Sequence, residues 1–138
     1  MRKITHIVVH CTATPEGRHH TANDIATWHK QRGWKTIGNH YVVQLDGTLE
    51  VGRAEQEVGA HVAGFNSNSI GVVYVGGVDR VKLQPKDTRT PAQKNALRLV
   101  LKTLKTRYPN AVIVGHRDFP GVAKACPSFD AKTEYAKL

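Results

Sequence analysis

The sequence predicts one α/β domain, spanning residues 1–138, with a mixed central β-sheet flanked by helices. A chain of 138 residues can bury one hydrophobic core without disulfides or a structural metal. Short apolar runs typical of strands alternate along it with segments whose apolar residues recur at helical spacing. One pair of strands flanks Asp46-Gly47, a hairpin signal, and must be antiparallel, so we expect a mixed sheet with helices packed on it.

The N-terminal part is expected to hold a strand and a helix. Residues 4–10 form an apolar, β-branched run, which predicts a buried strand that ends at His10. Thr21 and Asp24 have the spacing of a capping box, so a helix is predicted from there to about Arg32. Its inner side would carry Ile25, Trp28 and His29.

Further strands are predicted in the middle and near the end of the chain. Residues 41–45 and 48–51 flank Asp46-Gly47, a dipeptide that favours a two-residue hairpin turn. Residues 70–75 are apolar without interruption, which is typical of a central strand buried on both faces. Residues 111–114 predict the last strand.

Two more helices are expected. Thr90, Pro91 and Gln93 match a cap, a first-turn proline and a capping-box partner, so they start the longest helix, which Pro109 stops. Asp130 is expected to cap a short final helix. The apolar stripe of the long helix comprises Leu97, Val100, Leu101, Leu104 and Tyr108, and its basic residues Lys94, Arg98, Lys102 and Lys105 are expected to face solvent.

His10, His116 and Cys126 are residue types that ligate zinc. His10 ends the first predicted strand and His116 follows the last one, so the two meet if those strands are parallel neighbours. Strand geometry puts Cys11 on the opposite face from His10, and we expect it to be a small buried residue with a free thiol. A zinc ion with three protein ligands keeps a fourth position for water and lowers the pKa of that water to about 7, which is suited to hydrolysis.

Six motifs in consistent order resemble the zinc-dependent N-acetylmuramoyl-L-alanine amidases, in particular those of phages. They are VVHCTAT (8–14), WHKQRGW (28–34), LDGT (45–48), VGAH (58–61), NSIGV (68–72) and KACPSFD (124–130). The resemblance implies the fold of that family, zinc as cofactor, and His10, His116 and Cys126 as its ligands. It also implies hydrolysis of the amide between N-acetylmuramic acid and L-alanine in peptidoglycan, with Lys124 as the catalytic lysine that stabilises the oxyanion and delivers a proton.

The sequence departs from the family pattern at one position. Phage members carry a catalytic tyrosine immediately before the histidine that aligns with His40, whereas this chain has Asn39 there. Asparagine donates a hydrogen bond but exchanges no proton as a phenol does. Tyr41 is expected to point to the opposite face of its strand and to be a poor substitute.

The other histidines are weighed separately. His61 lies in a loop that borders the substrate cleft in the family, where a contact with peptidoglycan and a structural hydrogen bond are both open. No functional assignment is made for His6, His19, His20 and His29. The adjacent pair His19 and His20 is not taken as a metal site, because consecutive residues rarely point at one ion.

Two alternatives to an endolysin are open, one suggested by composition and one by the family resemblance. Lys and Arg outnumber Asp and Glu by 20 to 11, so the chain attracts polyanions. A nucleic-acid-binding protein is one alternative, but no motif for specific nucleic-acid recognition is found. The other is a non-catalytic peptidoglycan-binding module, against which Cys126 argues.

Partners and location follow from the resemblance. We expect a monomer that acts on peptidoglycan, and a phage RNA polymerase is left open as a second partner. The sequence has no apolar run long enough to cross a membrane and no signal-peptide core. We therefore expect the protein in the host cytoplasm, reaching the wall once another protein has permeabilised the membrane.

Overall fold

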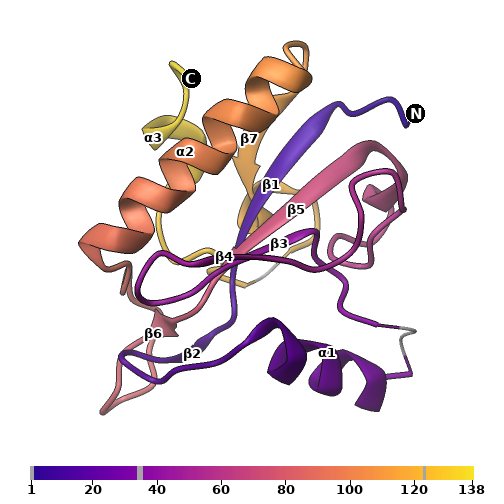
Figure 1. Ribbon diagram of the computed structural model, residues 1–138. Helices are drawn as coiled ribbons and strands as arrows, with labels where there is room; N and C mark the ends of the chain where they lie inside the picture. Colours follow the sequence, from indigo (N-terminus) through magenta and orange to yellow (C-terminus); the bar gives the residue numbers. More distant parts are fainter. Residues whose placement is uncertain (1, 34–35, 123) are drawn as a thin grey trace.

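The computed structural model describes residues 2–33, 36–122 and 124–138 and confirms the predicted fold class (Figure 1). Trp34, the last residue of one motif, lies outside this range. Five strands form a sheet in the order β4-β3-β5-β1-β7. They are β1 (His6–Cys11), β3 (Tyr41–Val43), β4 (Leu49–Val51), β5 (Ser69–Tyr74) and β7 (Val112–Gly115). All pair in parallel except β3 with β4, so the sheet is mixed as predicted.

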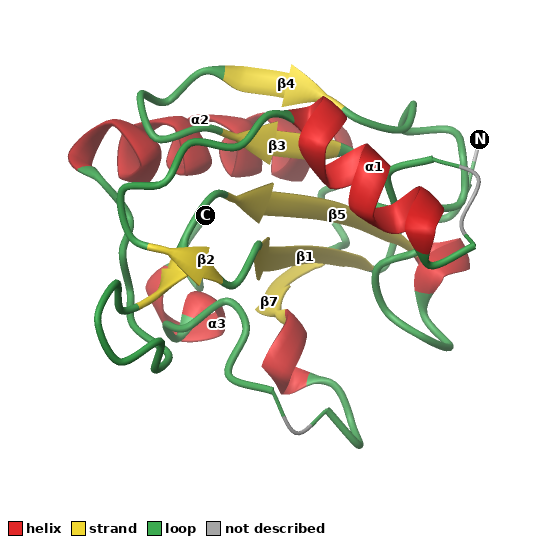
Figure 2. Cartoon of the chain, turned by 90° about the horizontal axis from the view of Figure 1, so that it is seen from below, coloured by secondary structure: helices red, strands yellow, loops and turns green. Residues whose placement is uncertain are grey.

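The helices cover both faces of the sheet. α1 (Ala22–Gln31) lies on one face and α2 (Pro91–Arg107) on the other, while the short α3 (Ala131–Glu134) lies beside β7 (Figure 2). Alternation along the strands sorts their side chains accordingly. Ile7 and Val9 pack with the apolar stripe of α2, whereas Val42 and Val73 pack with Ile25 of α1. No helix in the described part of the chain has the length and apolarity to cross a membrane.

The predicted helix caps are confirmed. Thr21 and Thr90 each accept a hydrogen bond from the backbone of a residue three positions on, and the side chains of Asp24 and Gln93 bond back to complete two capping boxes. Asp130 caps α3 through the backbone of Thr133. These local bonds explain why the helix starts could be read from the sequence.

The hairpin turn is one residue longer than predicted. Gln44 donates its N–H to the carbonyl of Thr48, so residues 45–47 form a three-residue turn. Gly47 takes a φ of +87° in it, a conformation that glycine adopts at no steric cost. The dipeptide thus marked the hairpin but not its length. A small parallel pair, β2 (Thr14–Pro15) with β6 (Gly77–Val78), was not predicted.

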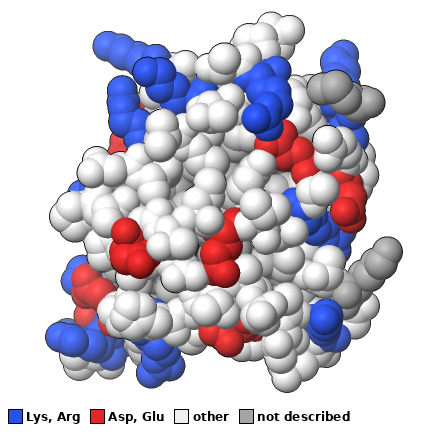
Figure 3. All heavy atoms as spheres, in the orientation of Figure 1, with Lys and Arg blue, Asp and Glu red and all other residues white. Residues whose placement is uncertain are grey.

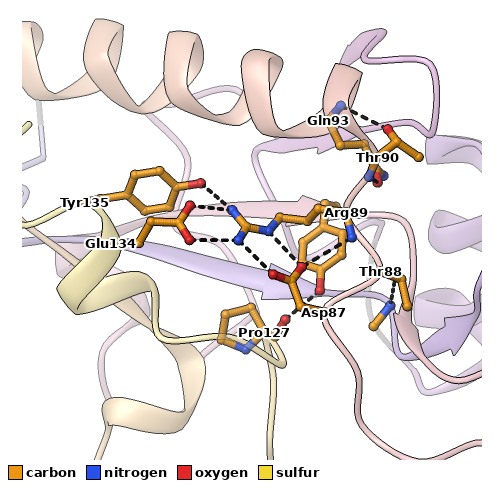
Figure 4. A network of polar contacts seen from close by, with 10 residues as sticks. Asp87, Thr88, Arg89, Thr90, Gln93, Pro127, Glu134 and Tyr135 are labelled. Atoms are coloured by element: carbon orange, nitrogen blue, oxygen red, sulfur yellow. Dashed lines mark hydrogen bonds and ion pairs between the residues drawn. The ribbon is translucent and has the colours of Figure 1, made fainter.

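A buried arginine fastens the C-terminal segment to the rest of the domain (Figure 4). The side chain of Arg89 is 2% exposed and pairs with Asp87 at 2.9 Å and Glu134 at 2.6 Å. It also donates to the hydroxyl of Tyr135, and its guanidinium lies 3.4 Å from the ring centre of Phe129. The network therefore joins the loop before α2 to α3 and to the segment that precedes α3.

We predict that Arg89→Ala destabilises the protein substantially, because it leaves two carboxylates without their partner and opens a cavity. The free energy of unfolding in urea should fall by about 2 kcal/mol or more, less than for a wholly buried pair because Glu134 stays partly solvated. Lys86→Ala is the control, since its ion pair with Glu16 is exposed. Equal stability of the two variants would contradict a structural role for Arg89.

Candidate metal centre and active site

The register of the parallel strands brings His10 and His116 together. Val9 of β1 lies opposite Gly115 of β7, so the residues that follow them are neighbours at the carboxyl ends of the two strands. The ring centres of His10 and His116 are 4.6 Å apart. The prediction that these histidines meet at one edge of the sheet is confirmed.

Cys126 reaches the same place from the loop after β7. Its Sγ lies 3.9 Å from Nδ1 of His10 and accepts a hydrogen bond from the backbone N–H of Cys11 at 3.2 Å. The Cys11 side chain and burial raise the pKa of Cys126 in the metal-free protein, so the thiol would lose its proton on binding a metal. Two bonds fix the loop: Arg117 donates its N–H to the carbonyl of Cys126 at 2.8 Å, and the Tyr74 hydroxyl donates to the carbonyl of Pro127 at 2.6 Å. Cys126 is thus held against the ends of β1 and β5.

The three side chains fit a zinc ion. Ligand atoms of His10, His116 and Cys126 all lie within 4.8 Å of one another. Burial lowers the pKa of His10 well below its usual value, and burial together with the nearby Lys124 lowers the pKa of His116. Both imidazoles are therefore neutral near pH 7 and have a lone pair to offer. Two neutral imidazoles and one thiolate are a donor set that zinc accepts, with one position left for a further ligand.

Cys11 stays outside this group, as predicted. Its side chain packs against the core on the α2 side of the sheet, while His10 faces the other side. Cys11 is partly buried and forms no disulfide, but it also lines the cavity of the site, and its thiol interacts with the side chains of Cys126 and Ser128.

A cavity of about 260 Å³ opens beside the three candidate ligands. It also has Lys124, Asn39 and His61 in its walls, so every residue predicted for the site lines one space. Lys124 is exposed, and its positive charge acts on His116 across the cavity. The remaining walls come from α1, β1, β5 and nearby loops, with Thr12, Ala13, Ile25, Trp28, His29, Arg32, Ala60 and Val73 among them.

Asn39 occupies the wall where the family pattern would put a phenol. It is 6% exposed, and its carbonyl accepts the N–H of Arg53 at 3.0 Å. Tyr41 does not line the cavity, and its hydroxyl donates to Glu55 on the other side. The prediction that Tyr41 points away from the site is therefore confirmed.

His29 lines the cavity although the sequence analysis gave it no role. Its Nδ1 accepts the N–H of Gly38 at 2.8 Å, so a neutral ring carries its proton on Nε2. Burial lowers the pKa of His29 to about 4. The signal that could have identified it was its place in the WHKQRGW motif.

Comparisons with known proteins agree with the geometry. Residues 1–129 match the family model described as N-acetylmuramoyl-L-alanine amidase. The chain is 44% identical to the endolysin of Klebsiella phage KP32, with 99% of the chain and 88% of that protein covered. It is 44% identical to the endolysin of Escherichia phage T7, with 95% and 85% covered. Among solved structures, the N-acetylmuramoyl-L-alanine amidase LysC of Clostridium intestinale URNW superposes with a TM-score of 0.81 at 29% identity and coverages of 99% and 84%.

We predict that the metal-free protein loses stability in mild acid. Burial holds the pKa of His29 at about 4 and lowers that of His40, whereas both titrate near 6.5 in an unfolded chain. Between these values the unfolded chain binds protons that the folded chain does not, so the free energy of unfolding falls as the pH drops from about 6.5 towards 4. Urea unfolding across this range, with a chelator present, measures the effect.

His29→Gln should flatten the pH dependence, while His19→Gln, a change at an exposed position, should leave it unaltered. A parent-like slope in His29→Gln would show that His29 does not contribute.

Proposed function

Because the chain belongs to the N-acetylmuramoyl-L-alanine amidase family, we propose that one zinc ion held by His10, His116 and Cys126 is its cofactor. The chain is an amidase of the phage endolysin type. Its proposed substrate is peptidoglycan, in which it hydrolyses the amide between N-acetylmuramic acid and L-alanine. The observation that carries the proposal is the convergence of two neutral imidazoles and a thiol on one open cavity.

We assign different roles in amide hydrolysis to the zinc ligands and to Lys124. Zinc bound to the three side chains supplies a Lewis acid that activates water and polarises a carbonyl. Lys124 lines the same cavity, where its ammonium is placed to stabilise the negative charge that develops on the amide oxygen. We also assign to Lys124 the delivery of a proton to the departing amine. Ile25, Trp28 and Val73 form a partly apolar part of the cavity wall.

Asn39 contributes polarity without acid-base chemistry. Its side-chain amide can donate a hydrogen bond to substrate but cannot take up or release a proton near neutral pH. Lys124 is therefore the cavity residue to which we assign proton transfer.

Charge supports an encounter with the anionic cell wall. The net charge of +9 attracts polyanions at long range. On the face seen in Figure 3, Lys and Arg lie mostly near the rim with Asp and Glu between them, so on this face the charge is spread rather than gathered into one patch. The spread of charge on this face fits general attraction to the wall. We place the protein in the host cytoplasm before lysis, with access to the wall through a membrane lesion made by another protein.

The proposal is tested by identifying the bond that is cleaved and by asking whether cleavage requires a metal. Purified peptidoglycan treated with the protein should release new amino groups of L-alanine and no new reducing sugar ends. A chelator should abolish the release and added Zn²⁺ restore it, and Cys126→Ser should bind zinc weakly and lose activity. New reducing ends, or full activity in Cys126→Ser, would overturn the proposal.

The absent phenol gives a second prediction. Asn39→Tyr should preserve or raise the rate of amide hydrolysis, because it adds a group able to exchange a proton at the cavity wall. Lys124→Gln, which removes the cation and shortens the side chain by one atom, is the reference variant for a large loss of activity. If Asn39→Tyr loses as much activity as Lys124→Gln, Asn39 has a role of its own.

A further inference from the structure

We propose that His61 is a positioning residue that fixes the tautomer and the ring orientation of His10. The inference rests on the proposed zinc site. The sequence left open whether His61 contacts substrate or makes a structural hydrogen bond, and the geometry points to a bond with a direct bearing on the metal centre.

Both ring nitrogens of His61 have partners inside the protein. Nδ1 lies 2.9 Å from Nε2 of His10, and Nε2 lies 3.1 Å from the hydroxyl of Ser69. The rings of His10 and His61 meet edge to face with centres 5.0 Å apart. His61 therefore lines the cavity with its ring while its polar atoms are already engaged.

The position of Cys126 indicates which group donates in each of these hydrogen bonds. Nδ1 is the nitrogen of His10 that faces Sγ of Cys126, so it must keep its lone pair free for a shared metal. The proton of a neutral His10 then sits on Nε2 and is donated to Nδ1 of His61. His61 in turn holds its proton on Nε2 and donates it to Ser69, which is fully buried.

The backbone around His61 leaves space for this ring orientation. A Cβ atom added to Gly71 would lie 2.8 Å from His61 Nδ1, and one added to Gly59 would lie 2.8 Å from Cδ2. His40 is held nearby by the N–H of Gly71 and the carbonyl of Glu57, with its ring centre 5.8 Å from that of His61. Two glycines and the fixed His40 ring thus form a slot that sets the plane of the His61 ring, and the two hydrogen bonds set which of its edges faces His10.

Zinc affinity tests the proposal apart from wall hydrolysis. We compare His61→Phe, which fills the slot but accepts no hydrogen bond, with His61→Asn, whose Oδ1 can replace Nδ1 as acceptor. Competition with a chromophoric chelator should show affinity for Zn²⁺ reduced about tenfold or more in His61→Phe, the usual loss when a partner of a ligating histidine is removed. His61→Asn should recover most of it, and His19→Asn, the control, should bind like the parent.

Several outcomes would overturn the proposal. Parent-like affinity in His61→Phe would do so, as would equal losses in the Phe and Asn variants or a loss matched by lower stability of the metal-free protein. If His61→Phe does not fold, ¹⁵N NMR of the zinc-loaded parent decides, because an Nδ1–H tautomer of His61 contradicts the inference. A parent that binds zinc without cutting the wall would count against the proposed function alone.

Discussion

The parallel pairing of β1 with β5 and β7 is the constraint on which the site depends. Because Val9 lies opposite Gly115, the residues that follow this last pair of the ladder, His10 and His116, are neighbours. A shift of one residue in this register would turn His10 to the α2 side of the sheet and separate the two rings. The apolar faces of β1 prevent such a shift, since Ile7 and Val9 must stay with the α2 core and Val8 with the opposite one.

Much of this could be predicted because the signals are local. Capping boxes at Thr21 and Thr90 involve residues three positions apart, and the unbroken apolar run of β5 records burial on both faces. His10 and His116 could be predicted as neighbours because each directly follows, or ends, a buried strand. Local signals could not predict that Cys126 joins the two histidines, because its position depends on a loop. That prediction came from the family resemblance.

Contacts between residues far apart in the chain could not be predicted from the sequence. The bond from His61 to His10 spans 51 residues, and the pair formed by Arg89 and Glu134 spans 45. The pairing of β2 with β6 involves only two residues on each side, too short for any periodicity. The predicted length of the turn at Asp46-Gly47 was wrong for another reason. The same dipeptide occurs in loops of two or three residues, and the strand register decides between them.

The three ligands of the proposed metal centre are held in place in two different ways. His10 lies in β1 and His116 directly follows the edge strand β7, while the third ligand belongs to a stretch fastened by Tyr74, Ser128 and the Arg89 network. This stretch is tied to the main core through Phe129, Ala131 and Tyr135. The position of Cys126 Sγ therefore depends on how firmly this stretch is anchored, whereas the positions of the two imidazoles depend on the pairing of β1 with β7.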